Sequence, residues 1–189
     1  MEMKAKGFRH WKQMEWIGFY FEFLCEGLLG EVMEIPGPKY GRVGFDGFLE
    51  IPWDLKAHAE NTSSHQIIVN DKEAVTLAQQ QYGKVGLVLA MGPVEYNDDE
   101  RSFQKWWQEL KGGPSAYEVK RIDRGAWSRL RKVSFRLDQI DFIVLDETAL
   151  QTCASFQTNF RNANGSPRRT KVLIDLEKLG REVAYRLKF

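Results

Sequence analysis

The spacing of apolar residues predicts helices that alternate with short strands. Large apolar residues recur at intervals of three and four through residues 8–29, a stretch without proline, which predicts one long helix. They are Trp11, Met14, Ile17, Phe21, Leu24 and Leu28. Further helices are predicted from about 71 to 82 and from about 98 to 110, and each is followed by a glycine (Gly83 and Gly112) suited to a helix C-terminus.

Shorter apolar runs predict the strands. Residues 42–48 and 53–58 read as two strands of a hairpin, because glycines and Pro52 punctuate the region between them. A loop is expected at 159–170 and a terminal helix at 177–187. The remaining strand-like runs are 67–69, 85–91, 140–145 and 171–176. This order predicts an α/β (α+β) fold with a central mixed sheet flanked by helices, in a single domain that covers residues 1–189.

Composition narrows the function classes. The 189 residues are 43% hydrophobic and 28% charged, with a net charge of +1, so contact with nucleic acid requires local clusters of Lys and Arg. No apolar run approaches the roughly 18 residues of a membrane span, and no signal peptide is evident. Cys25 and Cys153 lie far apart and form no zinc-binding pair, which favours a reducing cytoplasm.

The hairpin carries the candidate chemistry. Asp46 and Asp54 are eight residues apart, and a turn near Glu50 would bring them opposite or diagonal to each other. Two carboxylates there would repel unless a cation lay between them, and few carboxylates plus water and phosphate oxygens suit Mg²⁺. Lys56 shares a strand face with Asp54 by the period of two, whereas the Leu55 carbonyl stays near the metal edge. An ordinary solvated surface hairpin is the alternative interpretation.

These residues resemble the PD-(D/E)XK nuclease superfamily, the fold of many type II restriction endonucleases and junction resolvases. The resemblance covers about residues 8–91 and is carried by Gly44-Phe45-Asp46 and Trp53-Asp54-Leu55-Lys56. Phe45 stands where the family motif has proline. The resemblance implies that Asp46, Asp54 and the Leu55 carbonyl bind Mg²⁺, for which Mn²⁺ is expected to substitute, and that Lys56 is catalytic.

A further acidic residue is expected from the first helix, because the family often adds a Glu there. Gly18 to Glu22 resembles the G-x-x-x-E pattern of resolvase-like members, which favours Glu22 as a fourth catalytic residue and leaves Glu26 as the alternative. A solvated acidic stripe would explain the same pattern. His58 lies on the Asp54 face by parity, although packing or phosphate contact explains such a histidine more often than catalysis.

Two basic segments, near 111–132 and 159–171, are candidates for binding double-stranded DNA. Arg can read guanine and Asn adenine, whereas Lys mainly contacts phosphate. The predicted DNA-binding residues are Arg124, Ser128, Arg129, Arg131, Lys132, Arg161, Asn162, Asn164, Arg168 and Arg169. A solvated basic surface is the alternative for each segment.

These features favour a type II restriction endonuclease, a magnesium-dependent enzyme that acts on sequence-specific duplex DNA as a homodimer. A repair or Holliday-junction-resolvase-like nuclease is one alternative. A non-catalytic DNA-binding protein on the same fold is another. Nothing in the sequence suggests a P-loop, a nucleotide cofactor or a Ser-His-Asp hydrolase.

Overall fold

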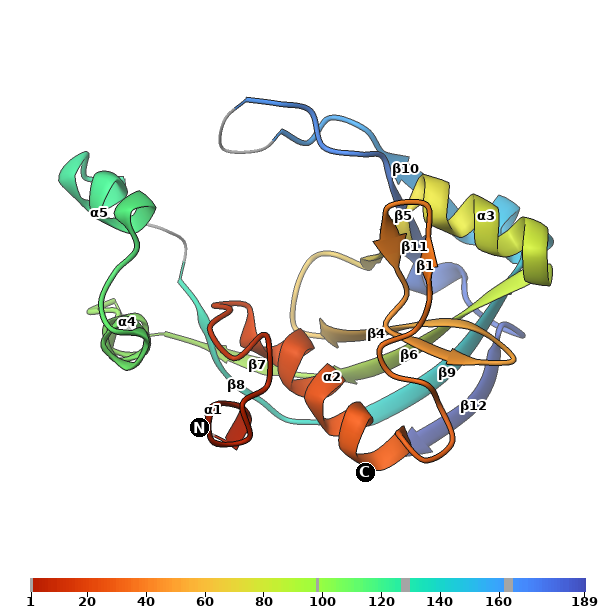
Figure 1. Ribbon diagram of the computed structural model, residues 1–189, viewed down its shortest axis with the longest axis horizontal. Helices are drawn as coiled ribbons and strands as arrows, with labels where there is room; N and C mark the ends of the chain where they lie inside the picture. The colour runs from red at the N-terminus through yellow and green to blue at the C-terminus, as the bar shows by residue number, and fades with distance from the viewer. Residues whose placement is uncertain (1, 98, 127–129, 162–164) are drawn as a thin grey trace.

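The computed structural model describes residues 2–97, 99–126, 130–161 and 165–189 (Figure 1). Its centre is a five-stranded mixed sheet of order β12-β9-β6-β4-β3, in which β4 and β6 are parallel and the other neighbours antiparallel. The strands are β3 (Gly47–Leu49), β4 (Ile51–Ala59), β6 (Lys84–Gly92), β9 (Gln139–Asp146) and β12 (Val183–Lys188). A mixed sheet with flanking helices confirms the predicted fold class.

Smaller antiparallel ladders accompany this sheet. Three strands form a second sheet of order β10-β11-β5, and two pairs form the ladders β1–β2 and β7–β8. Their bounds are β1 (Lys39–Tyr40), β2 (Val43–Gly44), β5 (Gln66–Asp71), β7 (Val94–Tyr96), β8 (Lys132–Phe135), β10 (Ala154–Gln157) and β11 (Lys171–Asp175).

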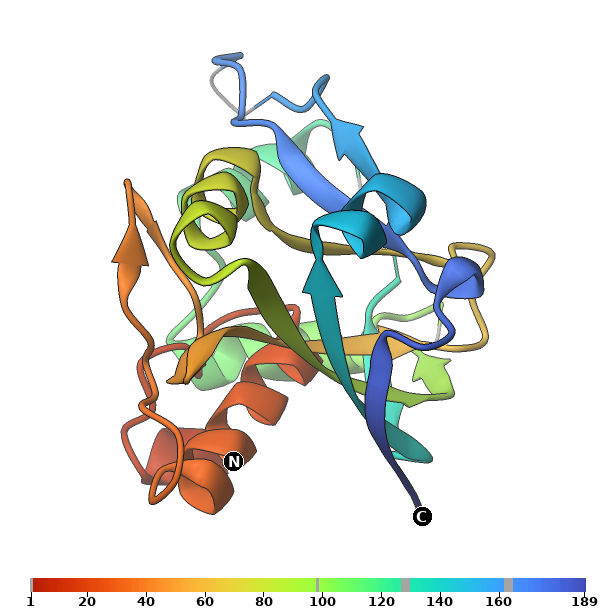
Figure 2. The same cartoon turned by 90° about the vertical axis from the view of Figure 1, so that its right-hand side faces the viewer.

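Helices cover both faces of the five-stranded sheet (Figure 2). On one face lies α2, whose Phe21 and Cys25 pack against Leu55 of β4 and Val88 of β6. On the other face lie α3, α6 and the three-stranded sheet. The helices are α1 (Glu2–Ala5), α2 (Trp16–Leu29), α3 (Lys72–Tyr82), α4 (Ser102–Lys111), α5 (Ala116–Asp123), α6 (Glu147–Cys153) and the 3₁₀ turn η1 (Leu176–Lys178).

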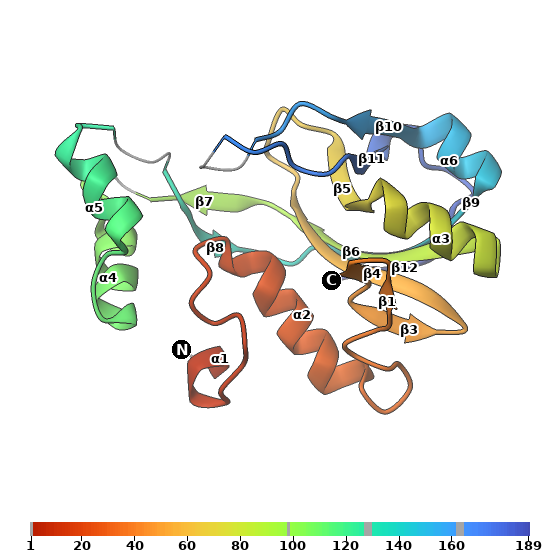
Figure 3. The ribbon, with the colours of Figure 1, turned by 45° about the horizontal axis from the view of Figure 1, so that its top comes forward.

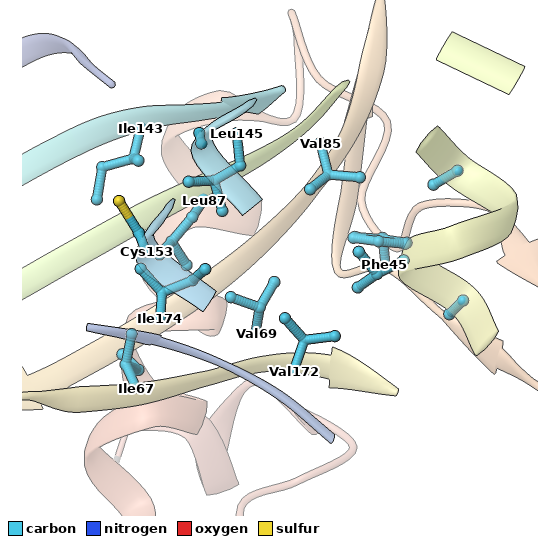
Figure 4. Packing of buried hydrophobic residues seen from close by; sticks show 14 of the residues in the cluster. Phe45, Ile67, Val69, Val85, Leu87, Ile143, Leu145, Cys153, Val172 and Ile174 are labelled. Atoms are coloured by element: carbon cyan, nitrogen blue, oxygen red, sulfur yellow. The ribbon is translucent and has the colours of Figure 1, made fainter. Parts of the chain in front are cut away.

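The larger hydrophobic core joins the two sheets (Figure 4). Leu87 of β6 and Leu145 of β9 are fully buried against strands β5 and β11, which contribute Val69 and Ile174. Neighbouring strand positions that pair across a ladder share one face. Because Asp54 pairs with Leu87 in the β4–β6 ladder, the Asp54 side chain points toward this core and away from α2.

The predicted helix 8–29 is wrong over residues 8–15, because α2 begins at Trp16. Residues before Trp16 turn back beside the helix: the Phe8 ring packs edge-on against Phe23 with a centroid distance of 5.3 Å, and Arg9 pairs with Glu22. A continuous helix would separate residues 9 and 22 by roughly 20 Å. Tertiary contacts therefore override the helical periodicity there.

The predicted terminal helix 177–187 is also wrong. After the short turn η1 the chain forms β12, antiparallel to β9. Arg186 makes two hydrogen bonds of 2.7 Å to Asp141 of β9, an interaction that the strand register permits. The spacing of Val183 and Leu187 is compatible with either a helix or a strand. The edge of β9 offers hydrogen-bonding groups to this segment, which therefore forms a strand.

Helices α4 and α5 extend away from the sheet on one side of the molecule (Figures 1 and 3). Trp107 is buried where α4 meets the N-terminal segment, and its indole N–H points to the Lys12 carbonyl at 3.5 Å. By contrast, α5 contains no buried side chain. Within the described part of the chain, no helix combines the length and apolarity needed to cross a membrane.

Candidate metal site

The β3–β4 hairpin places the acidic residues as the sequence predicts. Leu49 pairs with Ile51, so the turn lies at Glu50, whose φ of 60° is the left-handed conformation. The last ladder pair is Gly47 with Trp53. Beyond this pair the edge of β4 is no longer covered by β3, and the Asp46 side chain takes the place of a strand partner.

Asp46 binds both the backbone and the lysine of the D-x-K motif. Its Oδ2 accepts hydrogen bonds from the Leu55 backbone N–H and from Lys56 Nζ, each at 2.9 Å. In an extended strand the N–H and carbonyl of one residue point to the same side. The Leu55 carbonyl, predicted as a metal ligand, therefore faces the edge on which Asp46 lies.

The Lys56 ammonium lies between two carboxylates. Its Nζ is 2.9 Å from Asp46 Oδ2 and 3.4 Å from Asp54 Oδ1. Burial alone would lower the pKa of Lys56, but the charges of Asp54 and Asp46 raise it above its ordinary value. The lysine therefore stays protonated, and its positive charge offsets the repulsion between the two aspartates.

Asp54 is the most deeply buried member of the site, with a side chain 2% exposed. Burial raises the pKa of its carboxyl to about 7, although Lys56 acts in the opposite direction. Its Oδ1 accepts from Asn70, whereas its Oδ2 is buried without a hydrogen-bond partner among the described residues. A buried carboxylate oxygen without a partner is energetically unfavourable unless a cation or a proton satisfies it.

This donor set suits a hard divalent cation. Asp46 lies at the strand edge beside the Leu55 backbone, Lys56 Nζ links it to Asp54, and the bare Asp54 Oδ2 is an oxygen that a cation would satisfy. Among the described residues, no group of three His, Cys, Asp or Glu side chains is gathered closely enough to hold a metal without further ligands. Such a cation would therefore complete its shell with water and phosphate oxygens, as Mg²⁺ usually does.

Glu22 lies near this site on α2 and is buried. Burial and the negative charge of Asp46 raise the pKa of Glu22, whereas Arg9, which pairs with it, lowers it. The alternative residue, Glu26, is more exposed and lies 3.4 Å from the same guanidinium. The electrostatic influence of Asp46 on Glu22 favours Glu22 over Glu26, and its catalytic role stays a prediction.

Asn70 belongs to the site, and the sequence prediction missed it. From β5 its Nδ2 donates to Asp54 Oδ1 at 3.3 Å and to the Gly44 carbonyl at 3.0 Å. By sequence alone, Asn70 is a possible helix cap before the helix at 71–82. Its position at the end of an apolar run is a signal of burial, but nothing local indicates that β5 crosses the face of β4.

The predicted DNA-binding residues that the structure describes lie in different settings. Arg124 is exposed at the end of α5, Lys132 is partly buried on β8, and Arg131 pairs with Glu15. In the second segment, Arg161 and Arg168 are exposed, and Arg161 donates to the Gly165 carbonyl at 2.9 Å. Arg169 is 3.1 Å from Asp71, at the end of β5.

Four predicted DNA-binding residues lie outside the described residues. They are Ser128, Arg129, Asn162 and Asn164.

His58, on β4, lies in a different environment from the two aspartates. It lines a cavity of about 170 Å³ together with Glu15 and Lys132. Burial, followed by the Lys132 charge, lowers the pKa of His58. This environment keeps His58 neutral near pH 7, so it is not a cation that could offset the charges of the acidic site.

Comparisons with known proteins found no relative of this chain. No protein-family model, curated protein or solved structure matches the chain.

Proposed function

We propose that this chain is a magnesium-dependent endodeoxyribonuclease of the PD-(D/E)XK type, and specifically a type II restriction endonuclease. The observation that carries the proposal is the cluster of Asp46, Asp54 and Lys56, in which Lys56 Nζ contacts both carboxylates and the buried Asp54 Oδ2 lacks a partner among the described residues. Mg²⁺ would polarise the phosphate and lower the pKa of a bound water, so that this water could act as a nucleophile near neutral pH.

Each residue has a distinct role in this proposal. Asp54 and Asp46 hold the cation through their carboxylates, and the Leu55 carbonyl contributes a neutral oxygen. Lys56, kept protonated by the two carboxylates, stabilises negative charge that develops on the phosphate and orients the attacking water. Glu22 adds a further carboxylate, and Arg9, which pairs with it, offsets its charge.

Double-stranded DNA is the proposed substrate, bound by a homodimer in the cytoplasm. Charge complementarity supports a polyanion, because Arg124 is exposed at the end of α5, which extends away from the sheets (Figure 3), and Arg161 and Arg168 are exposed between β10 and β11. Two-fold symmetry in the protein matches two-fold symmetry in a palindromic DNA site.

Incubation of phage and plasmid DNA with the purified protein and MgCl₂ tests the proposal. We expect discrete fragments, and a loss of cleavage of roughly 100-fold or more in Asp54→Ala and in Lys56→Ala, because each removes a group that acts on the transition state. Unaltered cleavage in both variants would show that the proposed site is wrong.

Matched controls separate chemistry from folding. Asp138→Ala and Lys178→Ala remove the same charges from a partly buried and an exposed position outside the site, and cleavage by these variants should equal that of the wild type. Circular dichroism spectra of all four variants establish that they are folded.

The products distinguish the alternatives. Cleavage restricted to branched DNA, or fragments without defined ends, would indicate a resolvase-like or repair nuclease. Duplex binding without cleavage in Mg²⁺ or Mn²⁺ would indicate a non-catalytic DNA-binding protein. End sequencing of discrete fragments would give the recognition sequence and the stagger of the cut.

A further inference from the structure

Asn70 connects the two sheets at the candidate metal site. It lies in the three-stranded sheet, is 6% exposed, and makes three hydrogen bonds with its side chain. Its Nδ2 donates to Asp54 Oδ1 at 3.3 Å and to the Gly44 carbonyl at 3.0 Å, and its Oδ1 accepts from the Asp71 backbone N–H at 2.8 Å. Both the NH₂ group and the oxygen of this amide therefore face the protein rather than solvent.

Chemistry fixes the orientation of the Asn70 amide. The Asp71 backbone N–H is a donor and must face the amide oxygen, so the NH₂ group must face the two acceptors, Gly44 and Asp54. A primary amide has two N–H donors, one for each acceptor. Neither an apolar side chain nor a carboxylate could satisfy both acceptors at this position.

The two acceptors belong to the two segments that carry the proposed metal ligands. Gly44 precedes Asp46 by two residues, and Asp54 is itself a ligand. One amide thus holds both segments, and by binding Asp54 Oδ1 it leaves Oδ2 as the oxygen of this carboxylate that has no hydrogen-bond partner among the described residues.

Asn70 is itself held from behind. The adjacent Asp71 is buried and pairs with Lys171 and with Arg169, the latter at 3.1 Å. The Lys72 backbone N–H also donates to the Thr170 carbonyl at 2.9 Å. The end of β5 is therefore anchored to β11, and the amide sits on a rigid element, which an ordered ligand set requires.

We propose that Asn70 is the positioning residue of the metal site: it orients the Asp54 carboxylate and ties the Asp46 segment to it, without contacting the cation. This inference rests on the proposed nuclease function. Groups that orient metal ligands typically contribute roughly 10- to 100-fold to metal affinity, because a misoriented ligand must be reordered on binding.

Titration of the protein with MnCl₂ by calorimetry, without DNA, tests the proposal directly. We expect Asn70→Leu to weaken Mn²⁺ binding by about 10-fold or more. We expect Asn70→Ser to weaken it less, because a hydroxyl supplies one donor for two acceptors. Asn70→Ser also serves as the test if the leucine variant does not fold. Raising the concentration of Mg²⁺ should restore cleavage by both variants, which mere loss of fold would not allow.

Asn61→Leu is the control for the same amide-to-leucine change at an exposed position outside the site. Asn61 also bridges backbone groups, but both of them belong to Val94: its side chain bonds to the Val94 carbonyl at 2.8 Å and to the Val94 N–H at 2.9 Å. These bonds fasten the end of β4 to β7 rather than to the acidic hairpin. The Mn²⁺ affinity of Asn61→Leu should therefore equal that of the wild type.

The outcomes separate this inference from the function on which it rests. Unchanged Mn²⁺ affinity in folded Asn70→Leu or Asn70→Ser overturns the role of Asn70 while leaving the nuclease proposal intact. A wild-type protein that binds no Mn²⁺ and cuts no DNA overturns both. Weakened binding in the Asn70 variants beside normal binding in Asn61→Leu supports the positioning role.

Discussion

At the scale of single residues, the Asp54 carboxyl is in an environment that opposes its charge. It is buried, and its Oδ2 has no hydrogen-bond partner among the described residues. Only its other oxygen, Oδ1, is known to contact groups in the described part of the chain that stabilise the ionised form, namely Lys56 and Asn70. A group in this environment binds a proton until a stronger cation replaces it. The site should therefore be sensitive to pH in a direction that can be worked out.

Burial raises the pKa of Asp54 from 3.8 to about 7. Between those two values the folded chain holds a proton that the unfolded chain releases, so this group stabilises the fold below pH ~4 and loses that contribution as pH rises through ~7. Asp54→Asn cannot ionise. In EDTA, the free energy of unfolding of Asp54→Asn relative to wild type should increase by roughly 2–4 kcal/mol between about pH 4 and pH 8.

Urea denaturation at a series of pH values measures this difference. Taking the variant relative to wild type cancels the contributions of the other titrating groups. A difference that stays constant across the range would show that Asp54 ionises normally. Saturating Mn²⁺ should shrink the difference at about pH 8, because the cation stabilises the wild-type carboxylate but not the amide.

How far residues could be predicted depends on how local their geometry is. Asp46, Asp54 and Lys56 follow from strand parity and one turn, so the hairpin brings them together as expected. Arg9 and Asn70 reach the site from a folded-back segment and from another sheet. No periodicity within their own segments encodes those contacts, which arise from tertiary packing.

At the scale of elements, the predictions succeeded where the spacing of apolar residues and a residue that ends the element indicate the same boundary. Helix α3 ends before Gly83, whose φ of 73° is the left-handed conformation that glycine adopts readily. The start of α2 was predicted too early, and β12 was predicted as a helix. Contacts with neighbouring elements determine the structure in both places. Helix α5 was not predicted as an element, although Ser115 and Glu118 form a capping box at its start.

Helix α5 places several exposed side chains of the predicted DNA-binding segment 111–132 on one side of a helix. Tyr117, Lys120 and Arg124 are exposed and follow one another at spacings of three and four, so they share one side of the helix. Replacing Lys120 and Arg124 together by Ala should weaken duplex binding about 10-fold near ~0.1 M salt. The slope of log affinity against log salt should fall by about two, because each cation releases roughly one counterion.

Fluorescence anisotropy with a labelled duplex measures both quantities, in an Asp54→Ala background that prevents cleavage. Lys178→Ala/Arg181→Ala is the charge-matched control, because it removes two exposed cations between β11 and β12 and should leave binding unchanged. Equal losses in the two double variants would mean that the effect reflects net charge rather than the α5 face.

At the scale of the whole molecule, the core spans two sheets, whereas the basic residues proposed to bind DNA lie on peripheral elements. The net charge is only +1, so attraction to DNA depends on where the cations lie rather than on their excess. One chain offers one acidic hairpin, whereas a double-strand break requires two phosphodiester bonds to be cut. This stoichiometry is the reason for expecting a dimer.

Light scattering coupled to size-exclusion chromatography tests the dimer. We expect a mass about twice that of the 21.9 kDa chain, either for the free protein or, after subtraction of the DNA, for the Asp54→Ala variant bound to a palindromic duplex. A monomer at every concentration, with and without DNA, would contradict the dimer. It would favour a nicking or resolvase-like activity over restriction.

The junction between the sheets also bears on the order of folding. The β3–β4 hairpin closes within a few residues, whereas the contact of Asn70 with Asp54 spans 16 positions and depends on β11, which lies about 100 residues further along the chain. Local contacts form sooner than distant ones. A growing chain would therefore present both aspartates well before β11 is synthesised, so Asn70 would be anchored beside them only after about 100 further residues had been added.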